Sequence, residues 1–275
     1  MNSIPPLFTL RPPEAPEVPL IVNIPHAGTF VPADIDATFA SDAIRALPMT
    51  DWHLPHLYDF LPSLGVSTLY ANVSRFVIDL NRPPDAAPLY PGRFETGLVA
   101  TQTFQGDPIF RQPPDAETVE RRRVLYHQPY HQKLSELVDE KLGRFGTVVL
   151  IDAHSVASSP NKVHDRLTDD IYLGNRDGNS SEHWLIDEVA RCFASAGMKV
   201  ARNEPYKGGY ITAHYGHRPK VQALQIEMCQ RLYMDEENQA ELQENSEFLK
   251  MQRVLKKVVR SVISRRNSEI RAIGG

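Results

Sequence analysis

Cysteine is scarce in this chain, which has only Cys192 and Cys229 among its 275 residues. Two cysteines this far apart cannot form a disulfide framework, and they cannot supply a thiolate metal site of the Cys-x-x-Cys kind. Long apolar runs are also missing, because no stretch approaches the ~20 residues that a helix needs to span a bilayer. We therefore expect a soluble protein of the reducing cytoplasm that has no membrane partner.

An excess of charge of one sign is lacking as well. The 30 Lys and Arg residues nearly balance the 34 Asp and Glu residues, and the formal net charge is −4. Such a balance gives no electrostatic reason to expect nucleic acid or an acidic membrane as a partner. Residues 1–19 are rich in proline and lack a basic start followed by an apolar run, so we expect no signal peptide. The sequence does not predict the oligomeric state.

Strand-like and helix-like segments alternate along the rest of the chain. Short apolar runs at 20–24, 148–151 and 221–228 indicate buried strands, and amphipathic patterns at 115–142 and 235–265 indicate helices. This alternation predicts a single α/β domain over residues 20–275, with a mixed or largely parallel sheet flanked by helices. Residues 1–19 are expected to form a Pro-rich lead to that domain.

Several further segments give weaker expectations. Pro129 should kink or split the helix at 115–142. Residues 81–114 are crowded with Pro, Gly and Asp, and a loop of this length in a compact domain is usually functional or disordered. Its aromatic and polar content favours an ordered loop over a linker. The remaining expected elements are strands at 66–72, 76–80, 171–173 and 199–201 and helices at 41–47, 51–61 and 181–196.

Strands that end in polar residues point to a metal site. His26 and His154 each follow an apolar run closely, and Asp51 stands where a loop enters a helix. Ligands cluster at the carboxyl ends of strands in open α/β sheets, and catalytic zinc sites use three protein ligands from His, Asp and Glu. The chain has no His-Glu-x-x-His motif, so each histidine could instead merely end its strand.

Seven motifs stand in a fixed order between about Leu20 and Asp235. They are Pro25-His26-Ala27-Gly28, Thr50-Asp51-Trp52-His53, Ser74 to Pro83 (SRFVIDLNRP), Leu89-Tyr90-Pro91-Gly92, Asp152-Ala153-His154-Ser155, Lys207 to Thr212 (KGGYIT) and Gln225-Ile226-Glu227-Met228. Together they closely resemble the N-formylglutamate amidohydrolase family. Because the motifs are many and ordered, the resemblance is far more specific than any one of them.

The resemblance implies a fold and a reaction. The family is similar in fold to zinc carboxypeptidases and other zinc exopeptidases, so a zinc-exopeptidase-like (phosphorylase/hydrolase-like) fold is expected. Its reaction is the zinc-dependent hydrolysis of N-formyl-L-glutamate to formate and L-glutamate, the last step of histidine degradation. The implied partner is a small N-acyl amino acid, and the implied cofactor is one zinc ion. A site of two histidines and a carboxylate also accepts Co, Mn, Ni or Fe(II).

The same resemblance implies a ligand set for the metal. His26 and His154 are expected as ligands. Zinc carboxypeptidases place a glutamate three residues after their first histidine, but Thr29 stands there in this chain. The third ligand is therefore expected to be Asp51, with Asp79 in reserve, although Asp51 could instead be only the N-cap of a helix. Asp152 is expected to accept a hydrogen bond from a ligand histidine.

Roles for the substrate-handling residues follow in the same way. Glu227 is the expected general base, because a carboxylate within an apolar strand should face a polar cleft. Arg82 offers a planar fork for a substrate carboxylate and is expected to act beside Glu227 in catalysis. Arg75 either binds the second carboxylate or pairs with a structural acid. Asn81 is expected to orient the substrate, and Tyr210 either presents a phenol to it or only packs.

Two alternatives remain open. The enzyme could act on another N-acyl amino acid or a short peptide, because the shape of the pocket depends on the conformation of residues 81–114. The chain could also be a metal-free binding protein that keeps the fold. The joint presence of His26, His154, Arg82 and Glu227 argues against that second alternative.

Overall fold

The computed structural model describes residues 4–89, 92 and 94–273, with the side chains of the last helix described as far as residue 266. Tyr90 and Pro91, in the fourth of the ordered motifs, lie outside the described residues. The strands are β1 (Phe8–Arg11), β2 (Leu20–Ile24), β3 (Ser67–Ala71), β4 (Val148–Val156), β5 (Ile171–Gly174), β6 (Val200–Arg202) and β7 (Val221–Cys229). The α-helices are α1 (Ala33–Asp36), α2 (Asp42–Arg45), α3 (Leu54–Leu57), α4 (Ala116–Arg122), α5 (Gln128–Phe145), α6 (His183–Ser195), α7 (Tyr210–Gly216) and α8 (Ser246–Ile273).

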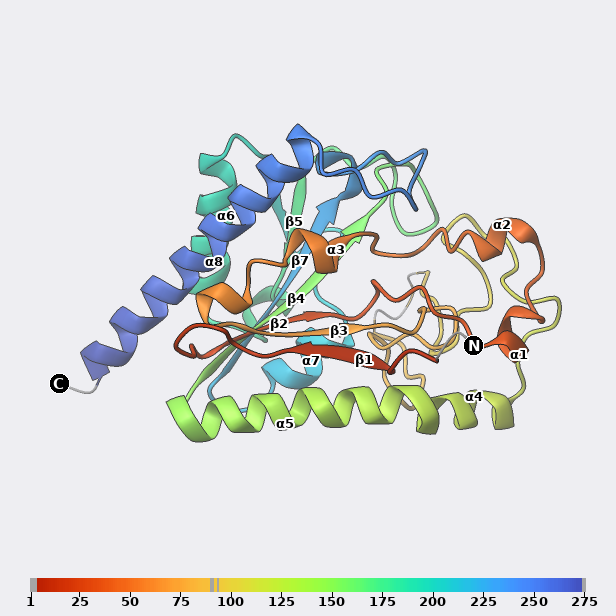
Figure 1. The fold of residues 1–275 in the computed structure, drawn as a ribbon, viewed down its shortest axis with the longest axis horizontal. Coiled ribbons are helices and arrows are strands. Elements are labelled where there is room, and N and C mark those ends of the chain that lie inside the picture. Colours follow the sequence, from red (N-terminus) through yellow and green to blue (C-terminus); the bar gives the residue numbers. More distant parts are fainter. Residues whose placement is uncertain (1–3, 90–91, 93, 274–275) are drawn as a thin grey trace.

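The strands form one mixed sheet in the order β1-β3-β2-β4-β7-β5-β6 (Figure 1). The four central strands β3, β2, β4 and β7 run parallel. Antiparallel pairing occurs where β1 joins β3 and where β5 joins β7. The expected α/β domain with a mixed, largely parallel sheet is thus confirmed.

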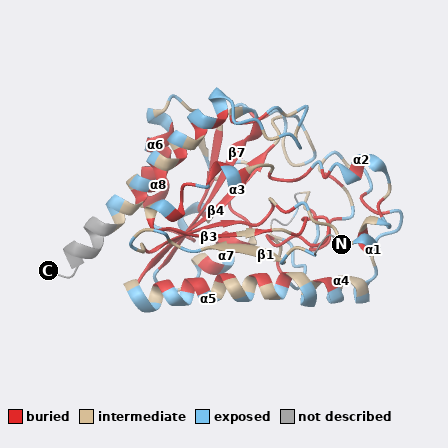
Figure 2. Ribbon diagram, viewed as in Figure 1, coloured by how far each residue is buried: buried red, intermediate tan, exposed pale blue. Residues whose placement is uncertain are grey.

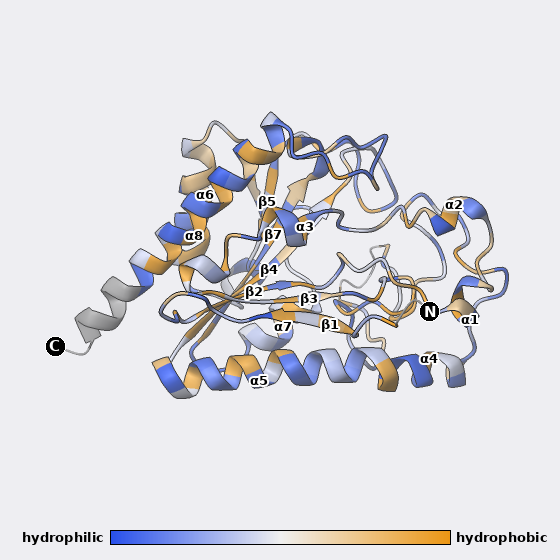
Figure 3. Ribbon diagram, viewed as in Figure 1, coloured by the Kyte–Doolittle hydropathy of each residue, from blue (hydrophilic) through white to orange (hydrophobic). Residues whose placement is uncertain are grey.

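Helices cover both faces of this sheet, as Figure 1 shows. Along β4, Val149 and Ile151 pack into the core beneath α3, α6 and α8, whereas Val148 and Leu150 pack on the opposite face with α5 and α7. Both faces of the central strands are therefore buried, which Figure 2 shows as continuous red and Figure 3 as a mainly apolar interior. Parallel strands that are covered on both faces have continuous apolar runs in their sequences, which is why these central strands could be predicted.

The long helix expected at 115–142 is divided near Pro129. Helix α4 is followed by a π-helical turn, Arg123–His127, and α5 begins at Gln128 with Pro129 in its first turn. Proline is tolerated there because the first turn of a helix leaves its N–H groups without intrahelical partners. The expected kink or split is confirmed.

Other expectations about single elements were wrong. Residues 76–80 form a turn, not a strand, and Val77 N donates to Ser74 O at 2.9 Å. Phe76, Val77 and Ile78 are all buried in that turn, and full burial gives the same apolar run as a core strand. The helix expected at 51–61 is reduced to α3 and a 3₁₀ turn at Pro62–Leu64.

The last helix begins later than expected, at Ser246, where the Asn245 side chain accepts hydrogen bonds from the N–H groups of Glu247 and Phe248. Strand β1, within the Pro-rich lead, and helix α7 were not predicted. Within the described part of the chain, no helix has both the length and the apolar character needed to cross a membrane.

Candidate metal centre and active site

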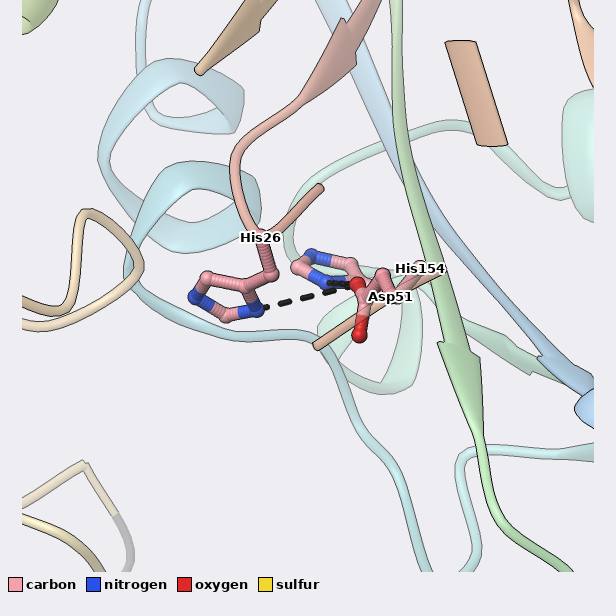
Figure 4. A group of neighbouring side chains, drawn as sticks. All are labelled: His26, Asp51 and His154. Carbon is pink, nitrogen blue, oxygen red and sulfur yellow. Dashed lines mark hydrogen bonds and ion pairs between the residues drawn. The ribbon is translucent and has the colours of Figure 1, made fainter. Parts of the chain in front are cut away.

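Three side chains from separate parts of the chain meet at the carboxyl end of the sheet. Potential ligand atoms of His26, Asp51 and His154 all lie within 4.8 Å of one another (Figure 4). Asp51 Oδ2 is 3.0 Å from His154 Nδ1 and 3.8 Å from His26 Nδ1. Ligand atoms around a tetrahedral zinc with bonds of about 2.1 Å are about 3.4 Å apart, so the cluster has the right size for such an ion.

The backbone holds these three side chains in place. His26 follows the end of β2, and His154 lies within β4. Asp51 N donates to His26 O at 3.0 Å, which ties two of the three segments together directly. The Gln230 side chain donates to Thr50 O at 3.0 Å, next to Asp51 in the chain, and to Ser155 Oγ at 3.3 Å, next to His154. Asp51 therefore lies in the cluster and is not the N-cap of α3, which is His53.

A second layer of carboxylates supports the two imidazoles. His26 Nε2 is 2.7 Å from Asp79 Oδ1, and His154 Nε2 is 3.1 Å from Asp152 Oδ2. If each Nε2 carries the proton, it donates to its acid, and each Nδ1 presents a lone pair to the centre. Asp79, the reserve ligand, thus lies on the far side of the His26 ring from Asp51. Asp152 makes the contact that was expected for it.

The electrostatics of this cluster favour a cation. Four carboxylates, Asp51, Asp79, Asp152 and Glu227, are buried around the two imidazoles. Burial by itself lowers the pKa of His154, yet the neighbouring Asp152 and Asp51 raise that pKa well above its usual value. Without a metal ion, the His154 imidazole therefore keeps a proton, and its positive charge lies between Asp152 and Asp51. A donor set of two imidazoles and a carboxylate, surrounded by further acids, fits a divalent ion.

Glu227 lies beside this centre on β7. Its Cα pairs in register with His154 on β4, and its side chain is 7% exposed. Gln225 Nε2 donates to Glu227 Oε2 at 3.1 Å. Burial raises the pKa of Glu227 to about 8, with the negative charge of Asp51 adding to the effect and His154 opposing it. A carboxyl group with a raised pKa next to a metal site is suited to accept and return a proton.

A cavity of about 430 Å³ opens onto the cluster, lined by His26, Asp51, His154 and Glu227. Arg82 lines it too, and its guanidinium is held by neutral oxygens. Nε donates to Thr96 O at 2.7 Å, and Nη1 donates to Asn81 O at 3.1 Å. The volume suits a small substrate, and Arg82 places a cation in its wall.

Asn81 and Arg75 also line the cavity but have structural partners. Asn81 Nδ2 lies 3.0 Å from His154 Nε2 and donates to Asp152 at 3.3 Å, while its Oδ1 accepts from Ile211 N. Arg75 Nη2 donates to Asp79 Oδ2 at 2.7 Å. Of the two readings of Arg75, the structure shows the pairing with a structural acid. Asn81 holds Asp152, the carboxylate that contacts His154.

Tyr210 is not among the residues that line the cavity. It begins α7, and its ring stacks on His214 with centroids 5.0 Å apart and meets the edge of His131. The Lys207–Thr212 motif acts instead through Gly209, because a Cβ there would lie 2.4 Å from the Asn81 side chain. Among the described residues, the tyrosine that lines the cavity is Tyr206.

The sequence reasoning missed several residues of the site. Gln225, which contacts Glu227, could have been found, because strand alternation places both on one face. Gln230 begins a 3₁₀ turn directly after β7, and Lys162 lies in an irregular loop, so neither carries such a signal. Their place in the cavity wall depends on the fold as a whole.

Comparison with known proteins supports the motif-based resemblance. Residues 18–234 match the family model of N-formylglutamate amidohydrolase. An N-formylglutamate deformylase from Pseudomonas aeruginosa is 41% identical over 224 residues, which are 80% of this chain and 84% of that protein. The crystal structure of N-formylglutamate amidohydrolase from Ralstonia eutropha JMP134 aligns with a TM-score of 0.80 and 31% identity, covering 94% of this chain and 98% of that one.

A crystal structure of a putative carboxypeptidase A from Shewanella denitrificans OS-217 is more distant, with a TM-score of 0.43 and 13% identity over 94% of this chain and 61% of that one. A likeness at that distance supports no conclusion about the site. The family match spans most of the chain and includes all seven ordered motifs. By sequence and by structure, the chain belongs to the N-formylglutamate amidohydrolase family.

Proposed function

We propose that this chain catalyses the zinc-dependent hydrolysis of N-formyl-L-glutamate to formate and L-glutamate. The buried cluster of His26, Asp51 and His154, with Glu227 beside it, is the observation that carries the proposal. Membership of the N-formylglutamate amidohydrolase family supports the substrate.

The proposed metal ligands are His26, Asp51 and His154. A divalent ion bound there would supply a water of lowered pKa and a Lewis acid for the formyl carbonyl oxygen. Asp79 and Asp152 fix the two imidazole rings with Nδ1 toward the centre. This arrangement makes both histidines better donors, since the acids balance the positive charge that ligation places on the rings.

The proposed proton carrier is Glu227. Its carboxylate takes a proton from the attacking water and passes it to the amide nitrogen, so that the amine leaves neutral. Gln225 donates to one oxygen of Glu227, which leaves the other oxygen to face the substrate. The position of Glu227 beside the proposed ligands, in register with His154, lets its carboxylate reach a water bound there and act as the base.

Arg82 is the proposed partner of a substrate carboxylate. Its Nε and Nη groups are fixed by Thr96 and by the carbonyl of Asn81, so the guanidinium is held in one orientation in the cavity wall. A planar fork held in this way binds a carboxylate in a defined geometry. Arg82 is thus a fixed cation in the cavity wall for one carboxylate of the substrate.

Formate release tests the proposal. The purified protein should release formate from N-formyl-L-glutamate, lose that activity with a chelator and regain it when zinc is restored. N-acetyl-L-glutamate and N-formyl amino acids with other side chains should react more slowly. Hydrolysis of another N-acyl amino acid, with N-formyl-L-glutamate inert, would overturn the substrate. Full activity in the chelated protein would overturn the role of the metal.

A further inference from the structure

The proposed substrate carries two carboxylates, but so far only one has a cationic partner. Among the described residues, the cationic side chains that line the cavity are Arg75, Arg82 and Lys162. Arg82 is the proposed partner of one carboxylate. Among the described residues, Arg75 and Lys162 are the remaining cationic candidates for the other carboxylate.

Arg75 is committed to the metal centre. Its guanidinium is 7% exposed, lies over the Phe104 ring at 5.3 Å and pairs with the fully buried Asp79. Asp79 in turn holds His26. Drawing Arg75 toward the substrate would strip a buried carboxylate of its cation, which is strongly unfavourable. Arg75 therefore balances charge and is a poor partner for the substrate.

Lys162 is placed differently. It lies in the loop between β4 and β5, and its backbone N donates to Phe104 O at 2.9 Å, which joins that loop to the one that carries Phe104. Its ammonium donates to Gln102 Oε1 at 2.9 Å and lies over the Phe94 ring at 5.4 Å. In the part of the chain that the structure describes, no acid pairs with it. The backbone is thus anchored, and the two described side chains that contact the ammonium, Gln102 and Phe94, are neutral.

The path of the Lys162 side chain is also defined. A Cβ added at Gly106 would lie 2.6 Å from Nζ, so the end of the side chain rests against that glycine. An ammonium has three donors, and Gln102 accepts from one of them. Donors therefore remain for an anion in the cavity.

The two cations lie at different depths. Arg82 directly follows Asn81, whose amide touches His154, and Arg82 is half-buried, whereas Lys162 is exposed in a loop. In N-formyl-L-glutamate, the α-carboxylate shares a carbon with the reacting formamide nitrogen, while methylene groups separate the side-chain carboxylate from it. The inner cation therefore matches the α-carboxylate, and the outer one matches the side chain.

We propose that Lys162 binds the side-chain carboxylate of N-formyl-L-glutamate and so determines the preference for a glutamate side chain. This inference rests on the proposed function. Lys162 favours a glutamate side chain in the substrate, because a neutral substrate side chain of similar shape would leave the Lys162 ammonium without an anion. The natural comparison substrate is N-formyl-L-glutamine, which differs only in that charge.

The test compares the two substrates in a Lys162→Gln variant. For N-formyl-L-glutamate, kcat/KM should fall about tenfold, mainly through KM, the size expected for losing one charged hydrogen bond. For N-formyl-L-glutamine it should stay within about twofold. Lys162→Arg should keep most of the preference. Lys207→Gln is the matched control, since Lys207 pairs with Asp177 outside the cavity lining.

Each outcome has a distinct meaning. An equal loss on both substrates would show that Lys162 only holds the loop, and no loss on either would show that it does not meet the substrate, so both results overturn the inference. If the unaltered protein releases formate from neither substrate, the proposed function fails and the inference fails with it. The metal content of the variant should equal that of the unaltered protein.

Discussion

Around the proposed metal centre, every candidate ligand is held by a partner on or beside a strand. At the mouth of the same cavity, side chains such as Lys162 come instead from irregular loops. His154 within β4 has Asp152, Asn81 and Asp51 around its ring. Lys162, by contrast, is attached through one backbone hydrogen bond, one side-chain hydrogen bond to Gln102 and a contact with the Phe94 ring. The comparison suggests that the sheet fixes the chemistry and that the loops set the choice of substrate.

The largest effect should come from the centre. Glu227→Gln should lower kcat by about 10²–10⁴-fold, because the amide cannot carry the proton. Metal content should be unchanged, since Glu227 is not among the proposed ligands. Steady-state kinetics and elemental analysis measure the two quantities, and Glu140→Gln on the exposed face of α5 serves as the control. Near-normal turnover would remove Glu227 from its role.

The supporting carboxylates should matter less than the base but more than the loops. Asp79→Asn should weaken metal binding about 10–100-fold, because His26 loses the anion that fixes its ring and Arg75 loses its partner. A competition titration with a chelating indicator measures the affinity. The exposed Asp177→Asn should leave it unaltered. An unchanged affinity in Asp79→Asn would show that the second layer does not act on the metal.

A substitution of the inner cation should affect substrate binding and not the metal. Arg82→Lys should raise KM about tenfold, since lysine keeps the charge but loses the planar fork held by Thr96 and the Asn81 carbonyl. Metal affinity should stay the same. A loss of metal in this variant would contradict the prediction, because it would show that Arg82 also supports the metal site.

The smallest effect concerns pH and the stability of the metal-free protein. The folded-state pKa of Glu227 is about 8, against 4.5 for the free group, and burial is the main cause. The folded protein therefore holds a proton that the unfolded chain releases, so this stabilisation is full below about pH 4.5 and is lost as the pH rises to about 8. Between pH 5 and 8, the melting temperature of Glu227→Gln should fall by a few degrees less than that of the unaltered protein. If the melting temperatures of the variant and the unaltered protein changed in parallel with pH, this interpretation would be contradicted.

Much of the centre could be predicted because His154 and Glu227 lie within strands and His26 closely follows one. The apolar run before His154 identifies β4, and parallel strands bring their carboxyl ends to one edge of the sheet. That geometry, with the resemblance to the family, led to Asp51 and Glu227. Sequence could not tell whether Asp79 binds the metal or supports His26, because spacing does not show which ring nitrogen a carboxylate reaches.

The cavity mouth could not be predicted in the same way. Lys162 and Phe104 meet only because two irregular loops cross, and neither loop has a periodic pattern. For Tyr210, the sequence left open whether its phenol meets the substrate or its ring only packs, and the structure packs the ring against His131 and His214. Side chains in loops take their place from long-range contacts that local sequence does not encode.

The metal content of the purified protein tests the central claim most directly. Elemental analysis should find one divalent ion per chain in the unaltered protein and none in the His154→Ala variant, with formate release from N-formyl-L-glutamate lost in the variant. An active enzyme without metal, or a variant that keeps its full metal content, would contradict the assignment of His26, Asp51 and His154 as the metal centre.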